Sequence, residues 1–134
     1  MTIKTFLCAA VLLGAGAGLA QAEDMDPGQA TFMQYCAGCH GNAGKGDGPM
    51  ADQLTTKVAD LTQLTKNNDG VFPMLDVIHI IDGRTGVRGH GGEMPIWGDR
   101  YKAATGEEAG PYGAELLVRG RILAVAQYLE SIQK

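Results

Sequence analysis

The chain has 134 residues, of which 45% are hydrophobic, and its formal net charge at pH 7 is −4. This length and composition are typical of one small globular domain. A mildly acidic balance does not favour nucleic acid or an anionic membrane surface as a partner, because both attract basic proteins.

Residues 1–22 have the three-part pattern of a secretory signal peptide. Lys4 supplies a positive charge, an apolar run covers 6–19, and Ala-Gln-Ala at 20–22 is a small-residue cleavage site. The apolar run is shorter than the roughly 20 residues that span a bilayer. We therefore expect a cleaved leader over 1–22 and a mature domain over 23–134 that is exported and does not span the membrane. An uncleaved membrane tether is the alternative.

The mature chain begins with a predicted helix that starts at Asp26 and Pro27. Asp is a favourable N-cap residue and Pro suits the first helical position. Gly28, Phe32 and Tyr35 then fall on one face of the helix. Glycine lowers helix stability, so we expect Gly28 to mark the close approach of another element.

The sequence Cys36-Ala37-Gly38-Cys39-His40 follows this helix and matches the c-type haem attachment pattern. Each thiol can add to one haem vinyl group, and the adjacent imidazole can bind the iron. A zinc site needs about four Cys or His ligands, and the mature chain has only these two Cys and three His. A redox dithiol would need a βαβ setting, which the sequence does not predict. We therefore expect one covalent haem c, with Cys36 and Cys39 as its thioethers and His40 as an axial ligand. No cysteine of the mature chain is then left for a disulfide.

Segment 41–49 is rich in glycine and ends at Pro49, a composition typical of a tight loop. We expect this loop to lie over one face of the haem. The Pro49 carbonyl is a candidate acceptor for the Nδ1–H of His40, which would orient the imidazole and strengthen it as a ligand. A plain turn proline is the other interpretation.

The middle of the chain predicts short helical turns over 51–65 and a helix over Pro73–Asp82 that ends at Gly83. On that helix, Leu75, Ile78 and Asp82 have helical spacing. His79 lies on the same helix, where a packed or partly solvated side chain is a better interpretation than a ligand.

The second axial ligand of the iron could be a Met, a His or neither. Met94 lies far enough beyond His40 to reach the opposite haem face, in a loop stiffened by Pro95. Met33 is too close to the attachment motif for that role. Met94 is therefore the predicted ligand, and His90, in the glycine-rich segment 85–92, is the second candidate.

Segment 99–113 is polar and is expected to be a loop, either solvated or facing a partner. The last predicted helix spans Ala114–Gln133, and Arg121 interrupts its apolar face. The Arg121 side chain either reaches outward to solvent or lies near a haem propionate. No stretch has a β alternation, so an all-α fold is expected. The apolar face of the last helix is formed by Leu117, Val118, Ala124, Val125, Tyr128, Leu129 and Ile132.

These motifs together resemble the class I monohaem bacterial cytochromes c. The resemblance is carried by Cys36–His40, by Gly46-Asp47-Gly48-Pro49, by Met94-Pro95-Ile96-Trp97-Gly98 and by a terminal helix with Tyr128-Leu129. It implies a small all-α fold around one haem, in which the first and last helices cross with Gly28 opposite the Tyr128 region. It also implies that His40 and Met94 ligate the iron, that the Pro49 carbonyl orients His40, and that the exported domain lies in a bacterial periplasm.

The expected function is one-electron transfer, with no catalytic residues and therefore no enzyme activity. Ligation by His and Met raises the reduction potential. Trp97 either donates a hydrogen bond to a haem propionate or packs on the ring. The expected partners are a dehydrogenase, an oxidase or a cytochrome complex, and the chain is a monomer or a subunit of a redox complex. The alternatives are a dedicated haem subunit of a periplasmic dehydrogenase, or an open-site haem enzyme or gas-binding protein.

Overall fold

The computed structural model describes residues 25–84, 93–105 and 109–134. These residues form helices and turns without a strand, so the all-α prediction is confirmed. The predicted leader over 1–22 and segment 85–92 with His90 lie outside the described residues. The α-helices are α1 (Pro27–Tyr35), α2 (Ala37–His40), α3 (Met74–Asp82), α4 (Trp97–Ala104) and α5 (Gly110–Ser131). Short 3₁₀ turns cover Ala51–Gln53, Leu61–Gln63 and Lys66–Asn68.

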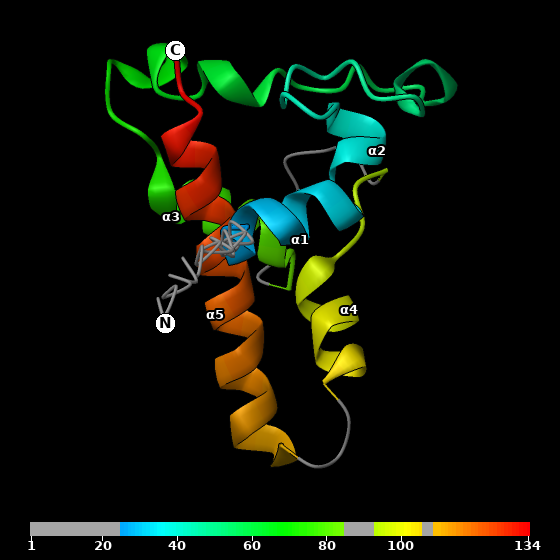
Figure 1. Cartoon of the computed structure of the whole chain (residues 1–134), viewed down its shortest axis with the longest axis vertical. Coiled ribbons are helices and arrows are strands. Elements are labelled where there is room, and N and C mark those ends of the chain that lie inside the picture. Colours follow the sequence, from blue (N-terminus) through cyan, green and yellow to red (C-terminus); the bar gives the residue numbers. More distant parts are fainter. Residues whose placement is uncertain (1–24, 85–92, 106–108) are drawn as a thin grey trace, which may run out of the picture.

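Helix α1 crosses the long helix α5, and these two make the most extensive contact between helices (Figure 1). The Asp26 side chain caps α1 by accepting a hydrogen bond of 3.0 Å from the Gln29 amide. A Cβ at Gly28 would lie 2.6 Å from the carbonyl carbon of Ala124. The crossing and the close approach at Gly28 are therefore as predicted. The residue opposite Gly28 is Ala124, one helical turn before Tyr128.

Helix α3 ends at Gly83, whose φ of 70° is the left-handed conformation that glycine adopts easily. Its limits match the predicted helix to within one residue. The predicted face does not match, because Val77 and Ile81 are the buried side chains and Leu75 is 70% exposed. Packing against α5 therefore selects a neighbouring stripe of this helix.

Helix α4 corrects the expectation of a loop over 99–113. It covers Trp97–Ala104 and packs against α5. Trp97 and Tyr101 are four residues apart and are only 8% and 3% exposed, so both lie on the face that the helix buries. The four-residue spacing of Trp97 and Tyr101 indicates a helix. We predicted a loop because the residues around them are mostly polar.

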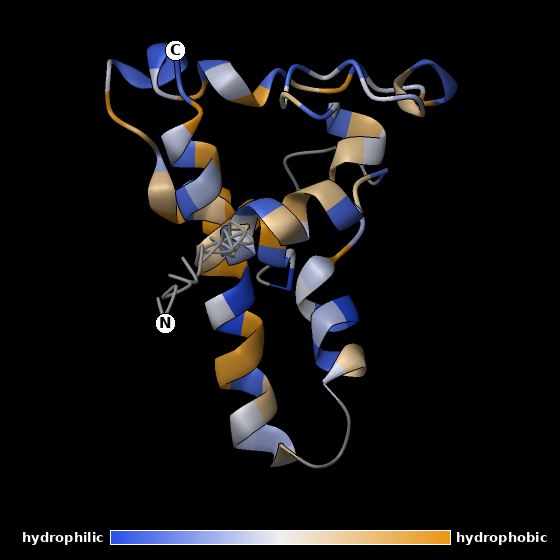
Figure 2. Cartoon of the chain, in the orientation of Figure 1, coloured by the Kyte–Doolittle hydropathy of each residue, from blue (hydrophilic) through white to orange (hydrophobic). Residues whose placement is uncertain are grey.

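Helix α5 starts at Gly110, four residues earlier than predicted, with Pro111 in its first turn. Pro is favourable there because the amides of the first turn have no intrahelical acceptor. Leu117, assigned to the apolar face, is 56% exposed. Figure 2 shows apolar residues in the N-terminal half of α5, which lies beyond the crossing with α1. The buried face consists of Ala114, Val118, Ile122, Val125, Ala126 and Leu129.

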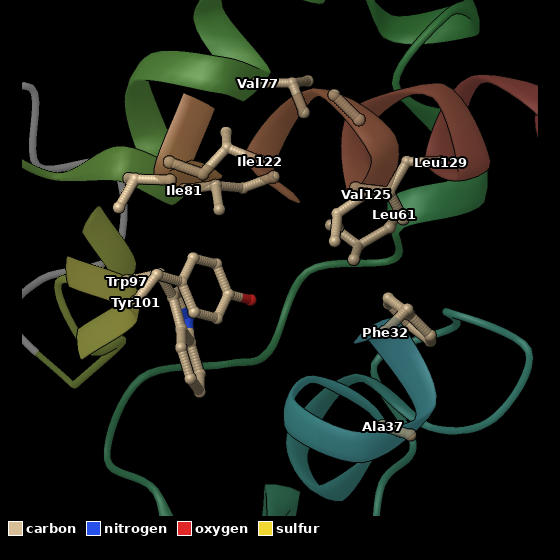
Figure 3. Close-up of a cluster of buried hydrophobic side chains, with 12 residues drawn as sticks. Phe32, Ala37, Leu61, Val77, Ile81, Trp97, Tyr101, Ile122, Val125 and Leu129 are labelled. Carbon is tan, nitrogen blue, oxygen red and sulfur yellow. The ribbon is translucent and has the colours of Figure 1, made fainter. Parts of the chain in front are cut away.

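The hydrophobic core joins side chains of α1, α3, α4 and α5 with Leu61 of the second 3₁₀ turn (Figure 3). Phe32 is fully buried, and its ring lies 5.3 Å from that of Tyr128. Met94 and Cys36 are partly buried against the same cluster. The core thus extends to two of the predicted site residues.

Candidate cofactor site

The short helix α2 presents the Cys36–His40 motif at the corner that follows α1. The amides of Cys39 and His40 donate to the Cys36 carbonyl at 3.1 and 2.9 Å. Both cysteines are half-buried free thiols, and His40 is 7% exposed. One tight turn therefore brings two sulfur atoms and one imidazole to the same cavity wall.

The Cys36 thiol has an unusual environment. Burial, and secondarily the neighbouring Cys39, raise its pKa from 9.0 to about 12. The physical cause is that a buried thiolate lacks the solvation that stabilises its charge.

The glycine-rich loop that follows His40 folds back over α2. The amides of Gly48 and Met50 donate to the carbonyls of Cys39 and Gly38 at 3.1 and 2.9 Å. A Cβ at Gly48 would lie 2.6 Å from the Cys39 carbonyl carbon. The loop therefore satisfies carbonyl groups of the motif helix, which a bulkier residue at 48 would obstruct.

The carbonyl oxygen of Ala59 lies 3.3 Å from Nδ1 of His40. The acceptor that we predicted for this nitrogen is the Pro49 carbonyl, and that role of Pro49 stays a prediction. Pro49 is exposed, and its neighbours on both sides are bonded to α2. Segment 58–61 contacts the loop that follows His40, because the Leu61 amide donates to the Gly44 carbonyl at 2.7 Å. A bond at Nδ1 fixes the orientation of an imidazole.

Two cavities meet at the motif. Both are partly open to solvent, and the space in and above them, open solvent included, is about 530 Å³ for one and about 730 Å³ for the other. Cys36, His40 and Met94 line both of them. The second reaches into the core, where its walls include Phe32 and Leu129. Mainly apolar walls of this kind are typical of cofactor sites.

Met94 enters the site from the segment that leads into α4. The preceding residue, Glu93, accepts hydrogen bonds from the amides of Thr55 and Thr56 at 2.9 and 2.8 Å, and from the Thr55 hydroxyl at 2.8 Å. These bonds lower the pKa of Glu93 from 4.5 to about 2. Nothing in the sequence around Glu93 predicted this contact, because its partners lie almost 40 positions earlier in the chain.

Trp97 lines the first cavity and belongs to an aromatic cluster. Its ring centroid lies 5.5 Å from those of Tyr35 and Tyr101. Tyr101 was not predicted as part of the site. Burial, and secondarily Cys36, raise the pKa of its hydroxyl, which has no hydrogen-bond partner among the described residues. Figure 3 shows Trp97 and Tyr101 side by side at the edge of the core.

Arg121 is exposed, and its guanidinium carbon lies 5.0 Å from the centre of the Tyr101 ring. This contact fits the outward orientation predicted for Arg121, with its charge over an aromatic face. His79 is exposed and lines neither of the two cavities. Within the described part of the chain, no three His, Cys, Asp or Glu side chains are grouped so as to hold a metal ion.

The family model described as cytochrome c oxidase, cbb3-type, subunit III matches residues 23–129. The chain belongs to this family of c-type cytochromes. The match confirms the resemblance to class I cytochromes c, and with it a role in haem-based electron transfer. Neither the curated proteins nor the solved structures contain a significant match to this chain.

As a cytochrome c, the chain is expected to act with redox partners, and the domain is typically extracytoplasmic. Among the helices that the structure describes, none combines the length and apolar character needed to cross a membrane. The family points to an electron carrier rather than an enzyme.

Proposed function

We propose that this cytochrome is a periplasmic one-electron carrier that holds one haem c covalently through Cys36 and Cys39. His40 and Met94 would be the two axial ligands of its iron. The observation that carries the proposal is that Cys36, His40 and Met94 border both cavities. The imidazole of His40 and the thioether of Met94 come from two separate segments, and both therefore line the same cavities as the Cys36 thiol.

The residues present fit this cofactor. Two thiols on one turn suit the two attachment points, and a buried imidazole with its Nδ1 next to the Ala59 carbonyl suits an iron ligand. Apolar side chains such as Phe32 and Leu129 offer the dry walls that a macrocycle requires. When bound, the haem would supply reversible exchange of one electron at its iron.

The protein would control this exchange through its two ligands. The thioether of Met94 favours ferrous iron and thereby raises the reduction potential. A Met94 bond would also close the sixth position against water and small ligands. Trp97, 8% exposed at the cavity wall, would donate its indole N–H to a haem propionate or pack on the ring. Tyr35 and Lys57 line the same cavity and are exposed, which supports electron transfer to a partner there.

A second candidate function is that of a dedicated haem subunit in a dehydrogenase or oxidase complex. The α4–α5 pair extends beyond the crossing with α1 (Figure 1). Three apolar side chains of α5 are at least 54% exposed there: Tyr112, Leu116 and Leu117. An exposed apolar stripe of this kind supports a permanent interface. Gel filtration of the protein from its native host would distinguish a free carrier from a subunit of a larger complex.

Replacing Met94 by Ala tests the proposed ligation. The ferric Met94→Ala protein should lose the sulfur-to-iron charge-transfer band, and its midpoint potential should fall. Met50→Ala is the matched control, because Met50 is 49% exposed and lines neither cavity. An unchanged Met94→Ala spectrum would contradict the assignment and direct attention to His90. Retention of the colour by the protein after acid–acetone extraction would support covalent attachment.

A further inference from the structure

Glu93 joins two segments that are distant in the sequence. Its Oε1 accepts from both the amide and the hydroxyl of Thr55, while Oε2 accepts from the Thr56 amide. Both oxygens of one carboxylate thus bind two consecutive amides, an arrangement with strong, charge-assisted hydrogen bonds. Glu93 is exposed, so water competes with these bonds and each contributes modestly.

The segment that Glu93 binds also contacts His40. Thr56, Lys57 and Val58 line the first cavity, and the next residue, Ala59, approaches Nδ1 of His40 with its carbonyl. The stretch 55–59 is therefore linked to both proposed ligands. One end binds the residue before Met94, and the other orients the imidazole.

We propose that Glu93 is a positioning residue that fastens Met94 to the 55–59 segment and thereby holds the sulfur at the cofactor. This inference rests on the proposed ligation by Met94. Without an acceptor side chain at position 93, no hydrogen bonds from this residue would join the segment before α4 to Thr55 and Thr56 at the cavity wall. Met94 would then spend more time away from the iron, and an external ligand would enter more easily.

Binding of imidazole to the ferric, haem-loaded protein measures this effect, because imidazole must displace Met94. The Glu93→Ala protein should bind imidazole about tenfold more tightly than the wild type, as expected for losing hydrogen bonds to a charged group. Glu93→Gln, which keeps an acceptor oxygen without the charge, should give an intermediate affinity. Thr55→Val removes only the hydroxyl bond and should have the smallest effect of the three.

Glu130→Ala is the matched control, since Glu130 is an exposed carboxylate on α5 that lines neither cavity. Its imidazole affinity should equal that of the wild type. A second measurement follows the amide protons of Thr55 and Thr56, which should exchange with solvent faster in Glu93→Ala. Faster exchange together with tighter imidazole binding would support the proposal.

The possible failures are distinguishable. If the wild type shows the sulfur-to-iron band but Glu93→Ala binds imidazole with unchanged affinity, the positioning role is wrong and the proposed function stands. The positioning role is also wrong if Glu93→Ala lowers only the midpoint of global unfolding. If the wild type lacks the sulfur-to-iron band, ligation by Met94 is wrong and the positioning role falls with it.

Discussion

Gly28 of α1 lies so close to the backbone of Ala124 in α5 that a Cβ at position 28 would come within 2.6 Å of the Ala124 carbonyl carbon. The obstacle is backbone, which cannot move aside like the end of a flexible side chain. The crossing of α1 and α5 therefore depends on the absence of a side chain at this position.

Gly28→Ala should destabilise the protein by about 1–3 kcal/mol, the usual cost of overpacking. The measurement is denaturant unfolding of the haem-loaded protein. Gly120→Ala is the control, because a Cβ at this α5 position meets nothing within 4 Å. It should leave stability unchanged or raise it by up to about 1 kcal/mol. Equal effects of the two substitutions would contradict the tight crossing.

The ferrous protein should not bind carbon monoxide at neutral pH, because His40 and Met94 would occupy both axial positions. Difference spectra recorded after addition of carbon monoxide provide the measurement. Met94→Ala, which opens one position, should bind the gas readily and serves as the positive control. Rapid and complete binding by the wild type would favour the open-site haem enzyme or gas-binding alternative.

Arg84 connects the end of α3 to α5 by binding two carboxylates, with Nε 2.6 Å from Asp82 and Nη1 2.7 Å from Glu115. Hydrogen bonds from Arg84, and then from Arg119, lower the pKa of Glu115 from 4.5 to about 2. The Arg84 bond likewise lowers the pKa of Asp82. Since both folded-state pKa values are depressed, the stabilising contribution is full above the unfolded-state values and is lost as the pH falls through the folded-state values.

The stability of the wild type should therefore fall between about pH 5 and pH 2 more steeply than that of Arg84→Gln. Unfolding midpoints measured at several pH values in this range would show the difference. Arg119→Gln removes only an exposed i,i+4 pair with Glu115, so its profile should stay close to that of the wild type. Parallel profiles for the wild type and Arg84→Gln would exclude this contribution.

Tyr101 buries a hydroxyl that has no hydrogen-bond partner within the described part of the chain. An unpaired buried hydroxyl is unfavourable, so Tyr101→Phe should raise the free energy of unfolding by about 1 kcal/mol. Tyr112→Phe is the control, since Tyr112 is 78% exposed and should tolerate the change. Destabilisation by Tyr101→Phe would instead reveal a partner for the hydroxyl in the haem-loaded protein.

Much of the fold was predictable where the signal is local. The start of α1 at Asp26 and Pro27, and the end of α3 at Gly83, follow from capping preferences within one turn. Helix α4 was missed because only Trp97 and Tyr101 carry its pattern. The wrong face was chosen for α3 because several stripes of that helix are apolar, and only contact with α5 selects one.

In the candidate site too, some features follow from local sequence and others depend on how distant segments pack. The spacing of Cys36, Cys39 and His40 by itself predicts haem attachment, because a single turn brings these side chains together whatever the rest of the chain does. The tertiary structure alone decided that the Ala59 carbonyl lies next to His40, and that Glu93 binds Thr55 and Thr56. Contacts between distant segments depend on how the whole chain packs, and no local preference encodes them.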